Sequence, residues 1–110
     1  MWIFGSNGLL CITAIPGNLD SLFIKTKNMA HLKHWFPEEN HLSKCYTAYP
    51  HRAVVSREVV AAALMKYLMS MEYEDFKNSI DESPYRLACS NIYDEINSYG
   101  KYRQRSDFEN

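Results

Sequence analysis

Four residues that can ligate metal ions lie close together along the chain. His31 and His34 are three positions apart in a predicted helix, and His41 and Cys45 follow in a polar loop. Imidazole nitrogen and thiolate sulfur are ligands that zinc prefers. The spacing fits none of the common zinc-finger patterns, and the simpler interpretation is that the two helical histidines are exposed. We therefore expect no metal site and no cofactor.

A second group has the residue types needed for acid–base or nucleophilic catalysis. His51 precedes Arg52, and an imidazole there could act as a general base beside an anion-binding group. Cys45 or Ser56 would have to supply the nucleophile. Ser56 is better explained as a helix N-cap, and Cys45 lacks a strong activating feature. We expect no catalytic residue; a small hydrolase or nuclease around His51 and Arg52 is a minor alternative.

Basic and aromatic residues fall on the predicted strands in a pattern suited to anions. Lys25 and Lys27 share one strand face because residues two apart point the same way. If Arg52 lies on a neighbouring strand, the three form a basic patch, with Phe23 and Tyr49 beside it. Such a surface can hold single-stranded nucleic acid or phosphate, although strand lysines also protect exposed sheet edges. The candidate residues are Lys25, Lys27, Tyr49, Arg52 and Lys77.

Acidic residues are concentrated in the C-terminal part of the chain. The net charge of −1 gives no support to general nucleic-acid binding, but acids outnumber bases from residue 71 onward. An acidic helical surface could meet a basic protein partner, and the plainer interpretation is a solvated face. The candidate partner-binding residues are Glu72, Glu74, Asp75, Asp81, Glu82, Asp94 and Glu95.

Apolar alternation predicts the strands that must position these residues. Short runs at 2–4 and 9–15 flank Asn7-Gly8, a pair typical of tight hairpin turns. Residues 21–27 alternate with period two, and 52–55 form a further strand. A less regular run at 44–48 is also assigned as a strand.

Capping residues and apolar spacing predict the helices. Asn28 begins a helix that Pro37 ends, and Ser56 begins a long one. Residues 72–80 form a short helix or turn. Ser83-Pro84 starts the last helix, and Gly100 is its predicted stop. Its apolar seam, expected to pack on the sheet or on the helix from Ser56, comprises Tyr85, Cys89, Ile92, Ile96 and Tyr99.

These elements define an α+β fold, with an antiparallel sheet of four to five strands and two to three helices packed on one face. We expect a single domain over residues 1–100 and a polar tail over 101–110.

No run of residues is long and apolar enough to span a membrane, and no signal-peptide pattern opens the chain. Three scattered cysteines then indicate a reduced, cytoplasmic protein. We expect a monomer or a homodimer.

The order of several short motifs resembles a family of short, uncharacterised bacterial and phage proteins. The motifs are MWIFGSNG, DSLFIKTKN, YPHRAVVSRE, YEDFK and NIYDEINSYG. The chain departs from the pattern at Gly5-Ser6, where the family has Thr-Lys, and at 25–27, where two arginines are usual. No activity is assigned to the family, so the resemblance implies fold and provenance rather than function.

Small size, the lack of a catalytic motif, the acidic helical half and abundant tyrosine favour a non-catalytic interaction protein of bacterial, phage or mobile-element origin. Its partner would be a protein, and its concrete form would be an inhibitor of a host defence nuclease complex, such as an anti-CRISPR-type protein. The alternatives are a small single-stranded nucleic-acid or phosphate-binding module and the minor hydrolase or nuclease.

Overall fold

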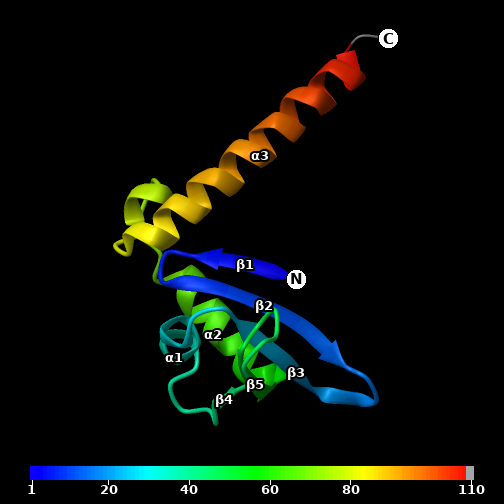
Figure 1. The fold of residues 1–110 in the computed structure, drawn as a ribbon, viewed down its shortest axis with the longest axis vertical. Coiled ribbons are helices and arrows are strands. Elements are labelled where there is room, and N and C mark those ends of the chain that lie inside the picture. Colours follow the sequence, from blue (N-terminus) through cyan, green and yellow to red (C-terminus); the bar gives the residue numbers. More distant parts are fainter. Residues whose placement is uncertain (109–110) are drawn as a thin grey trace. The chain divides into compact units, whose positions relative to one another are not determined.

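The computed structural model describes residues 1–108, and the chain divides into two compact units, Met1–Glu74 and Asp75–Asn110. The first unit contains a sheet and two α-helices, and the second contains a 3-10 helix and a long α-helix (Figure 1). The predicted α+β class is confirmed. The division after residue 74 differs from the single domain expected over 1–100.

The sheet has five antiparallel strands in the order β1-β2-β3-β5-β4, at the upper end of the predicted range. The β3–β5 pairing is the one that matters for the candidate site, because it aligns Lys25 with Arg52 and Ile24 with Ala53. The strands are β1 (Trp2–Gly5), β2 (Gly8–Ile15), β3 (Asn18–Thr26), β4 (Leu42–Ser43) and β5 (His51–Ser56).

The first hairpin turns one position earlier than predicted. Gly5 pairs with Gly8, so the two turn residues are Ser6 and Asn7. Gly8 belongs to β2 and has φ 147°, and a Cβ there would lie 2.4 Å from Cγ of His31. Glycine is needed at this position because the backbone conformation and the approach of His31 both exclude a side chain.

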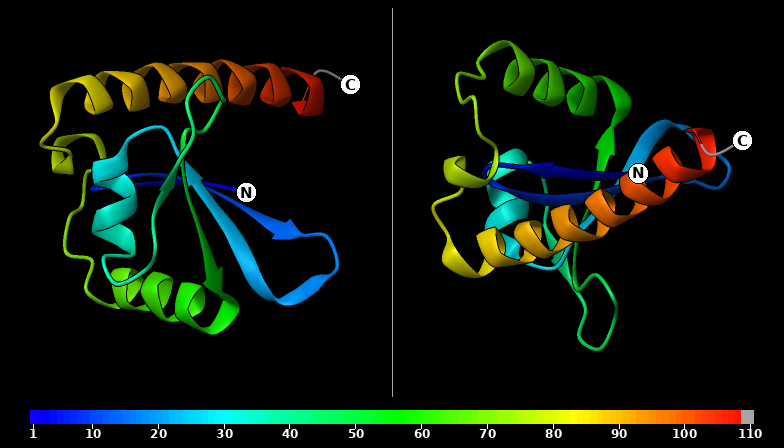
Figure 2. Two further views of the ribbon diagram at one scale, coloured as in Figure 1. Left: turned by 60° about the horizontal axis from the view of Figure 1, so that its bottom comes forward. Right: turned by 90° about the horizontal axis from the view of Figure 1, so that it is seen from above.

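The predicted strand at 44–48 is wrong, because that segment is a loop between β4 and β5. β4 contains only Leu42 and Ser43, and Tyr46 at the loop tip has φ 60°. A left-handed residue of this kind interrupts a strand. The loop extends away from the strands (Figure 2).

Two helices, α1 (Met29–Trp35) and α2 (Arg57–Met69), cover one face of the sheet (Figure 2). Both predicted caps are confirmed: Asn28 Oδ1 accepts from Ala30 N at 2.9 Å, and Ser56 Oγ accepts from Val59 N at 3.2 Å. The core between helices and sheet comprises Leu10, Ile12, Ile24, Leu32, Trp35, Phe36, Ala53, Val55 and Val60.

Tyrosine hydroxyls tie the first hairpin to α2. Tyr67 OH accepts from Ser6 N at 2.8 Å and lies 2.8 Å from Tyr73 OH. Burial first, and then the Tyr67 hydroxyl, raise the pKa of Tyr73 to about 12. The Tyr67 ring packs against Trp35 with centroids 4.9 Å apart, and Trp35 Nε1 has no hydrogen-bond partner within residues 1–108. This network stabilises the edge of the core by directional bonds as well as apolar packing.

The second unit consists of η1 (Lys77–Ser79) and α3 (Ser83–Phe108). The Ser83-Pro84 helix start is confirmed, but Gly100 does not stop the helix, and residues 101–108 of the predicted tail are helical. Glycine inside a helix costs only about 1 kcal/mol relative to alanine. The ion pair between Arg103 and Asp107, at 3.0 Å and four residues apart, supports the last turns. Residues 109–110 lie outside the described residues.

The apolar seam predicted for α3 is buried over only part of its length. Tyr85 and Cys89 are buried and Ile92 is half-buried, whereas Ile96 and Tyr99 are 61% and 62% exposed. Helical spacing places residues on a common face but does not determine how far a partner surface extends along that face. No helix within residues 1–108 is long and apolar enough to cross a membrane.

Candidate nucleic-acid interface

Strand register separates the sheet into two chemically different faces. Leu10, Ile24 and Val55 belong to the core, so they define the inner face, toward α1 and α2. Side chains alternate along each strand, so Phe23, Lys25 and Arg52 point from the opposite, outer face. We call the following residues the outer-face cluster: Trp2, Phe23, Lys25, Lys27, Tyr49 and Arg52.

Cations lie over aromatic rings throughout this cluster. The Lys25 ammonium is 5.4 Å from the ring centroid of Phe23 and 5.7 Å from that of Tyr49. The Lys27 ammonium is 4.8 Å from the Tyr49 centroid, and the Arg52 guanidinium is 5.7 Å from the Phe23 centroid. The negative face of each ring attracts these cations and fixes their positions at the surface.

Hydrogen bonds from the cluster anchor the end of the 44–50 loop that leads into β5, at Ala48 and Tyr49. Lys27 Nζ donates to the Ala48 carbonyl at 2.7 Å, and Arg52 Nε donates to the Tyr49 carbonyl at 3.1 Å. Trp2 Nε1 donates to the Tyr49 hydroxyl at 2.9 Å. The cluster is therefore preorganised, with β1, β3, β5 and the loop all contributing.

The positive charge of the cluster is not neutralised by protein carboxylates. Within residues 1–108, Lys25, Lys27 and Arg52 form no ion pair; the one described there joins Arg103 to Asp107. Lys27 and Arg52 use one N–H each for loop carbonyls, which leaves further donors on both groups. Burial, and next the Cys11 thiol, raise the pKa of Tyr49, so its hydroxyl stays neutral beside these cations.

The other predicted anion-binding residue, Lys77, belongs to the second unit. It lies in η1, with its ammonium 4.8 Å from the ring centroid of Tyr93. The sequence analysis missed Trp2 as a cluster member. The sequence indicates that Trp2 and Ile3 point to opposite sides of their strand, but it does not say which side is the outer face. The pairing of Trp2 with Cys11 assigns Trp2 to that face.

The acidic residues do not share one helix face. Glu72 and Glu74 follow α2 in the first unit, and Asp75 begins the second. The Asp75 carboxylate accepts from Lys77 N at 3.1 Å and from Asn78 Nδ2 at 2.7 Å, so it fixes the η1 turn. The remaining four lie before or within α3, at Asp81, Glu82, Asp94 and Glu95.

The histidines have local structural partners. His31 is buried, contrary to its predicted exposure, because Nδ1 accepts from Leu9 N at 3.2 Å beneath Gly8. His34 is exposed as predicted, and His41 Nε2 lies 2.7 Å from the Phe36 carbonyl oxygen. Among the described residues, no group of three or more His, Cys, Asp or Glu side chains could hold a metal ion.

His51 and Arg52 point from opposite faces of β5. His51 pairs with buried Thr26, whereas Arg52 pairs with Lys25 in the outer-face cluster. The hydrogen bond described for the His51 ring joins it to Ser43, whose Oγ lies 3.0 Å from Nδ1. The pair suggested by sequence adjacency therefore cannot act on one substrate from one side of the sheet.

Comparison of the chain with protein-family models, curated proteins and solved structures found no match. The resemblance to the bacterial and phage family therefore stays a prediction.

Proposed function

We propose that the protein binds single-stranded nucleic acid through the outer-face cluster. The observation that carries this proposal is the set of three cations without a carboxylate partner, each in contact with an aromatic ring on one sheet face. Phosphates require unneutralised cations, and bases require exposed rings. The cluster supplies both in one unit.

The roles of the residues follow from their exposure. Lys25, Lys27 and Arg52 would contact consecutive phosphates, while bases stack on Trp2, which is 63% exposed, and on fully exposed Tyr46 at the loop tip. Stacking of one base on an aromatic side chain contributes about 1–3 kcal/mol and tolerates any base. Binding would therefore be largely independent of sequence.

The dependence of binding affinity on salt concentration measures how many phosphates the protein contacts. Each phosphate neutralised on a single strand contributes about −0.7 to the slope of log affinity against log salt, so three contacts predict a slope of about −2. Fluorescence anisotropy of a labelled oligothymidine measures this slope. A flat dependence would show that the cations do not contact phosphate.

The decisive comparison uses two double variants with the same charge change. Lys25→Gln with Lys27→Gln removes two cations of the cluster, and Lys33→Gln with Lys66→Gln removes two exposed lysines of α1 and α2. We expect the first to weaken oligonucleotide binding at least about tenfold and to lower the salt slope, and the second to change little. Equal loss in both, or no loss in the first, would reject the interface.

A second candidate function is protein binding, favoured by apolar side chains of α2. Met65, Leu68 and Met69 are all exposed and lie on one side of the helix. The inhibitor hypothesis and the bacterial or phage provenance stay predictions. Recovery of a reproducible protein partner from bacterial lysate, lost on Met65→Lys with Met69→Lys, would support this candidate; no reproducible partner would count against it.

A further inference from the structure

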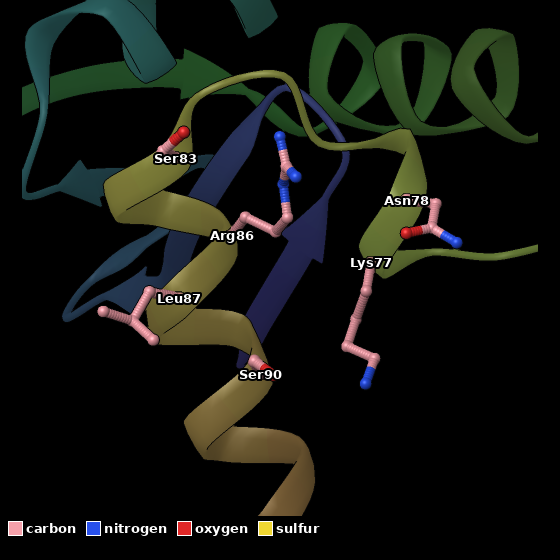
Figure 3. Close-up of a pocket in the computed structure, with 6 residues that line it drawn as sticks. All are labelled: Lys77, Asn78, Ser83, Arg86, Leu87 and Ser90. Atoms are coloured by element: carbon pink, nitrogen blue, oxygen red, sulfur yellow. The ribbon is translucent and has the colours of Figure 1, made fainter.

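The long helix α3 has an apolar face that is covered near its start and exposed further along. Figure 3 shows the first turns of α3 beside η1, and in these turns Tyr85 and Cys89 are buried. Arg86 Nε donates to the Ile80 carbonyl at 3.0 Å, which joins the turns to the segment before the helix. The helix then continues to Phe108 (Figure 1).

The exposed part of this face keeps the spacing of its buried part. Ile96, Tyr99 and Tyr102 are 61%, 62% and 70% exposed, and Ile92 is half-buried. Apolar residues at alternating intervals of three and four are the pattern of helices that pair side by side. Most of the stability of a helix in a protein comes from burying such a face, so a partner surface is expected. We call the following residues the α3 seam: Ile92, Ile96, Tyr99, Tyr102 and Arg103.

Charges along α3 make the helix complementary to a second copy of itself. Acidic residues lie near its middle and basic residues toward its C-terminal end; the acids are Asp94 and Glu95, and the bases are Lys101, Arg103 and Arg105. Asp107 accepts from Arg103 at 3.0 Å, but bases still outnumber acids in this end segment. Two antiparallel copies place the acidic stretch of each opposite the basic stretch of the other, whereas parallel copies oppose like charges.

The seam fixes the register of such an antiparallel pair. When Ile96 lies opposite Tyr99 of the partner subunit, Ile92 lies opposite the partner's Arg103. Glu95 is then three residues from the same partner arginine, about 4.5 Å along the helix axis, within reach of its long side chain. The guanidinium has several N–H donors, so it can bond a carboxylate of each copy.

The area of the seam suits a dimer of modest affinity. A large aromatic side chain buries about 150–250 Å², so two tyrosines and two isoleucines from each copy, all partly exposed, give about 1,000 Å² in total. That area is near the lower limit for specific interfaces. We therefore expect a dissociation constant in the micromolar range.

We propose that the α3 seam is the interface of an antiparallel homodimer. Ile96 and Tyr99 of each copy pack across the two-fold axis, and Glu95 pairs with the partner's Arg103. The interface belongs to the second unit and does not depend on nucleic-acid binding by the outer-face cluster.

Sedimentation equilibrium of the full chain, from micromolar to near-millimolar concentration, tests the interface. We expect a monomer–dimer equilibrium. Ile96→Lys should weaken dimerisation at least about tenfold, because it places an unpaired charge among apolar side chains. Ser98→Lys is the matched control: it adds the same charge to an exposed position on the other side of the helix and should leave the equilibrium unchanged. Circular dichroism checks that both variants remain folded.

Glu95→Gln tests the orientation of the two helices. In the antiparallel pair it removes an attraction to the partner's Arg103, so it should weaken the dimer about two- to fivefold, and added salt should weaken the unchanged dimer. In a parallel pair the same substitution removes a repulsion between like charges, so it would strengthen the dimer.

Three results would each overturn the proposal: a monomer at every concentration, a dimer that Ile96→Lys leaves intact, and a tighter dimer of Glu95→Gln. A fourth is a monomeric chain that Ile96→Lys destabilises in urea, because the seam would then be covered by the same chain. Oligothymidine binding plays no part in these measurements, so failure of the dimer and failure of the proposed nucleic-acid interface are distinguishable.

Discussion

The inner and outer faces of the sheet are built from the same strands, yet their side chains have different roles. Alternate residues of β5 illustrate the difference: Val55 is 1% exposed and packs under the helices, while Val54 is 53% exposed on the other side. The inner face stabilises the fold by close packing. The outer face keeps charge and aromatic surface available, and stability constrains it less. Substitutions on the two faces should therefore have separable effects.

The largest expected effect tests how tightly the inner face fits α1. Gly8→Ala would place a Cβ 2.4 Å from His31 in a backbone conformation that alanine disfavours. Strain and overpacking together should lower the free energy of unfolding by about 3 kcal/mol. Gly17→Ala is the control, because Gly17 has φ 76° but no atom within 4 Å of the new Cβ. Urea denaturation should show a clearly smaller loss for the control; equal losses would mean that the contact with His31 is unimportant.

A matched pair of valines separates the two faces directly. Val55→Ala removes two buried methyl groups and leaves a cavity, so it should lower the free energy of unfolding by about 2 kcal/mol. Val54→Ala removes the same atoms from the outer face and should cost about 0.5 kcal/mol. Equal destabilisation in denaturant titrations would indicate that the outer face is also part of a packed core.

The converse experiment measures binding instead of stability. Trp2→Ala should weaken oligothymidine binding about tenfold, in line with the loss of one stacked base, while the free energy of unfolding changes by less than about 1 kcal/mol. Leu19→Ala removes an apolar side chain outside the cluster that is even more exposed than Trp2, and it should leave binding unchanged. Anisotropy titrations of both variants check this. Undiminished affinity of Trp2→Ala would remove stacking from the proposed interface.

The smallest effect concerns the tyrosine pair at the edge of the core. The folded pKa of Tyr73 is about 12, and an unfolded tyrosine titrates near 10. Between these values the unfolded chain loses the proton first, so the contribution of Tyr73 to stability is complete below pH 10 and is lost as the pH rises toward 12. Unfolding measured at pH 9 and pH 11 should show a smaller decrease for Tyr73→Phe than for the unchanged chain. Parallel decreases would contradict the assignment.

The sequence predicted the candidate cluster in part. Lys25 lies on β3 as expected, because alternation depends only on local backbone geometry. Lys27 follows the last residue of that strand, and its ammonium shares the Tyr49 ring with that of Lys25. Their neighbour Arg52 lies 27 positions beyond Lys25, and only the β3–β5 register brings the two residues together. The hydrolase hypothesis placed His51 and Arg52 in one site because they are adjacent in the sequence, although adjacent strand residues point to opposite faces.

Features that depend on interactions within a few residues were predicted correctly from the sequence. They are the helix caps at Asn28 and Ser56, the alternation of β3 and the start of α3 at Ser83. Tertiary structure decided the burial of His31 and the position of Trp2 beside Tyr49. These outcomes depend on which distant segments meet, and that is set by the packing of the whole chain rather than by the preferences of any one stretch.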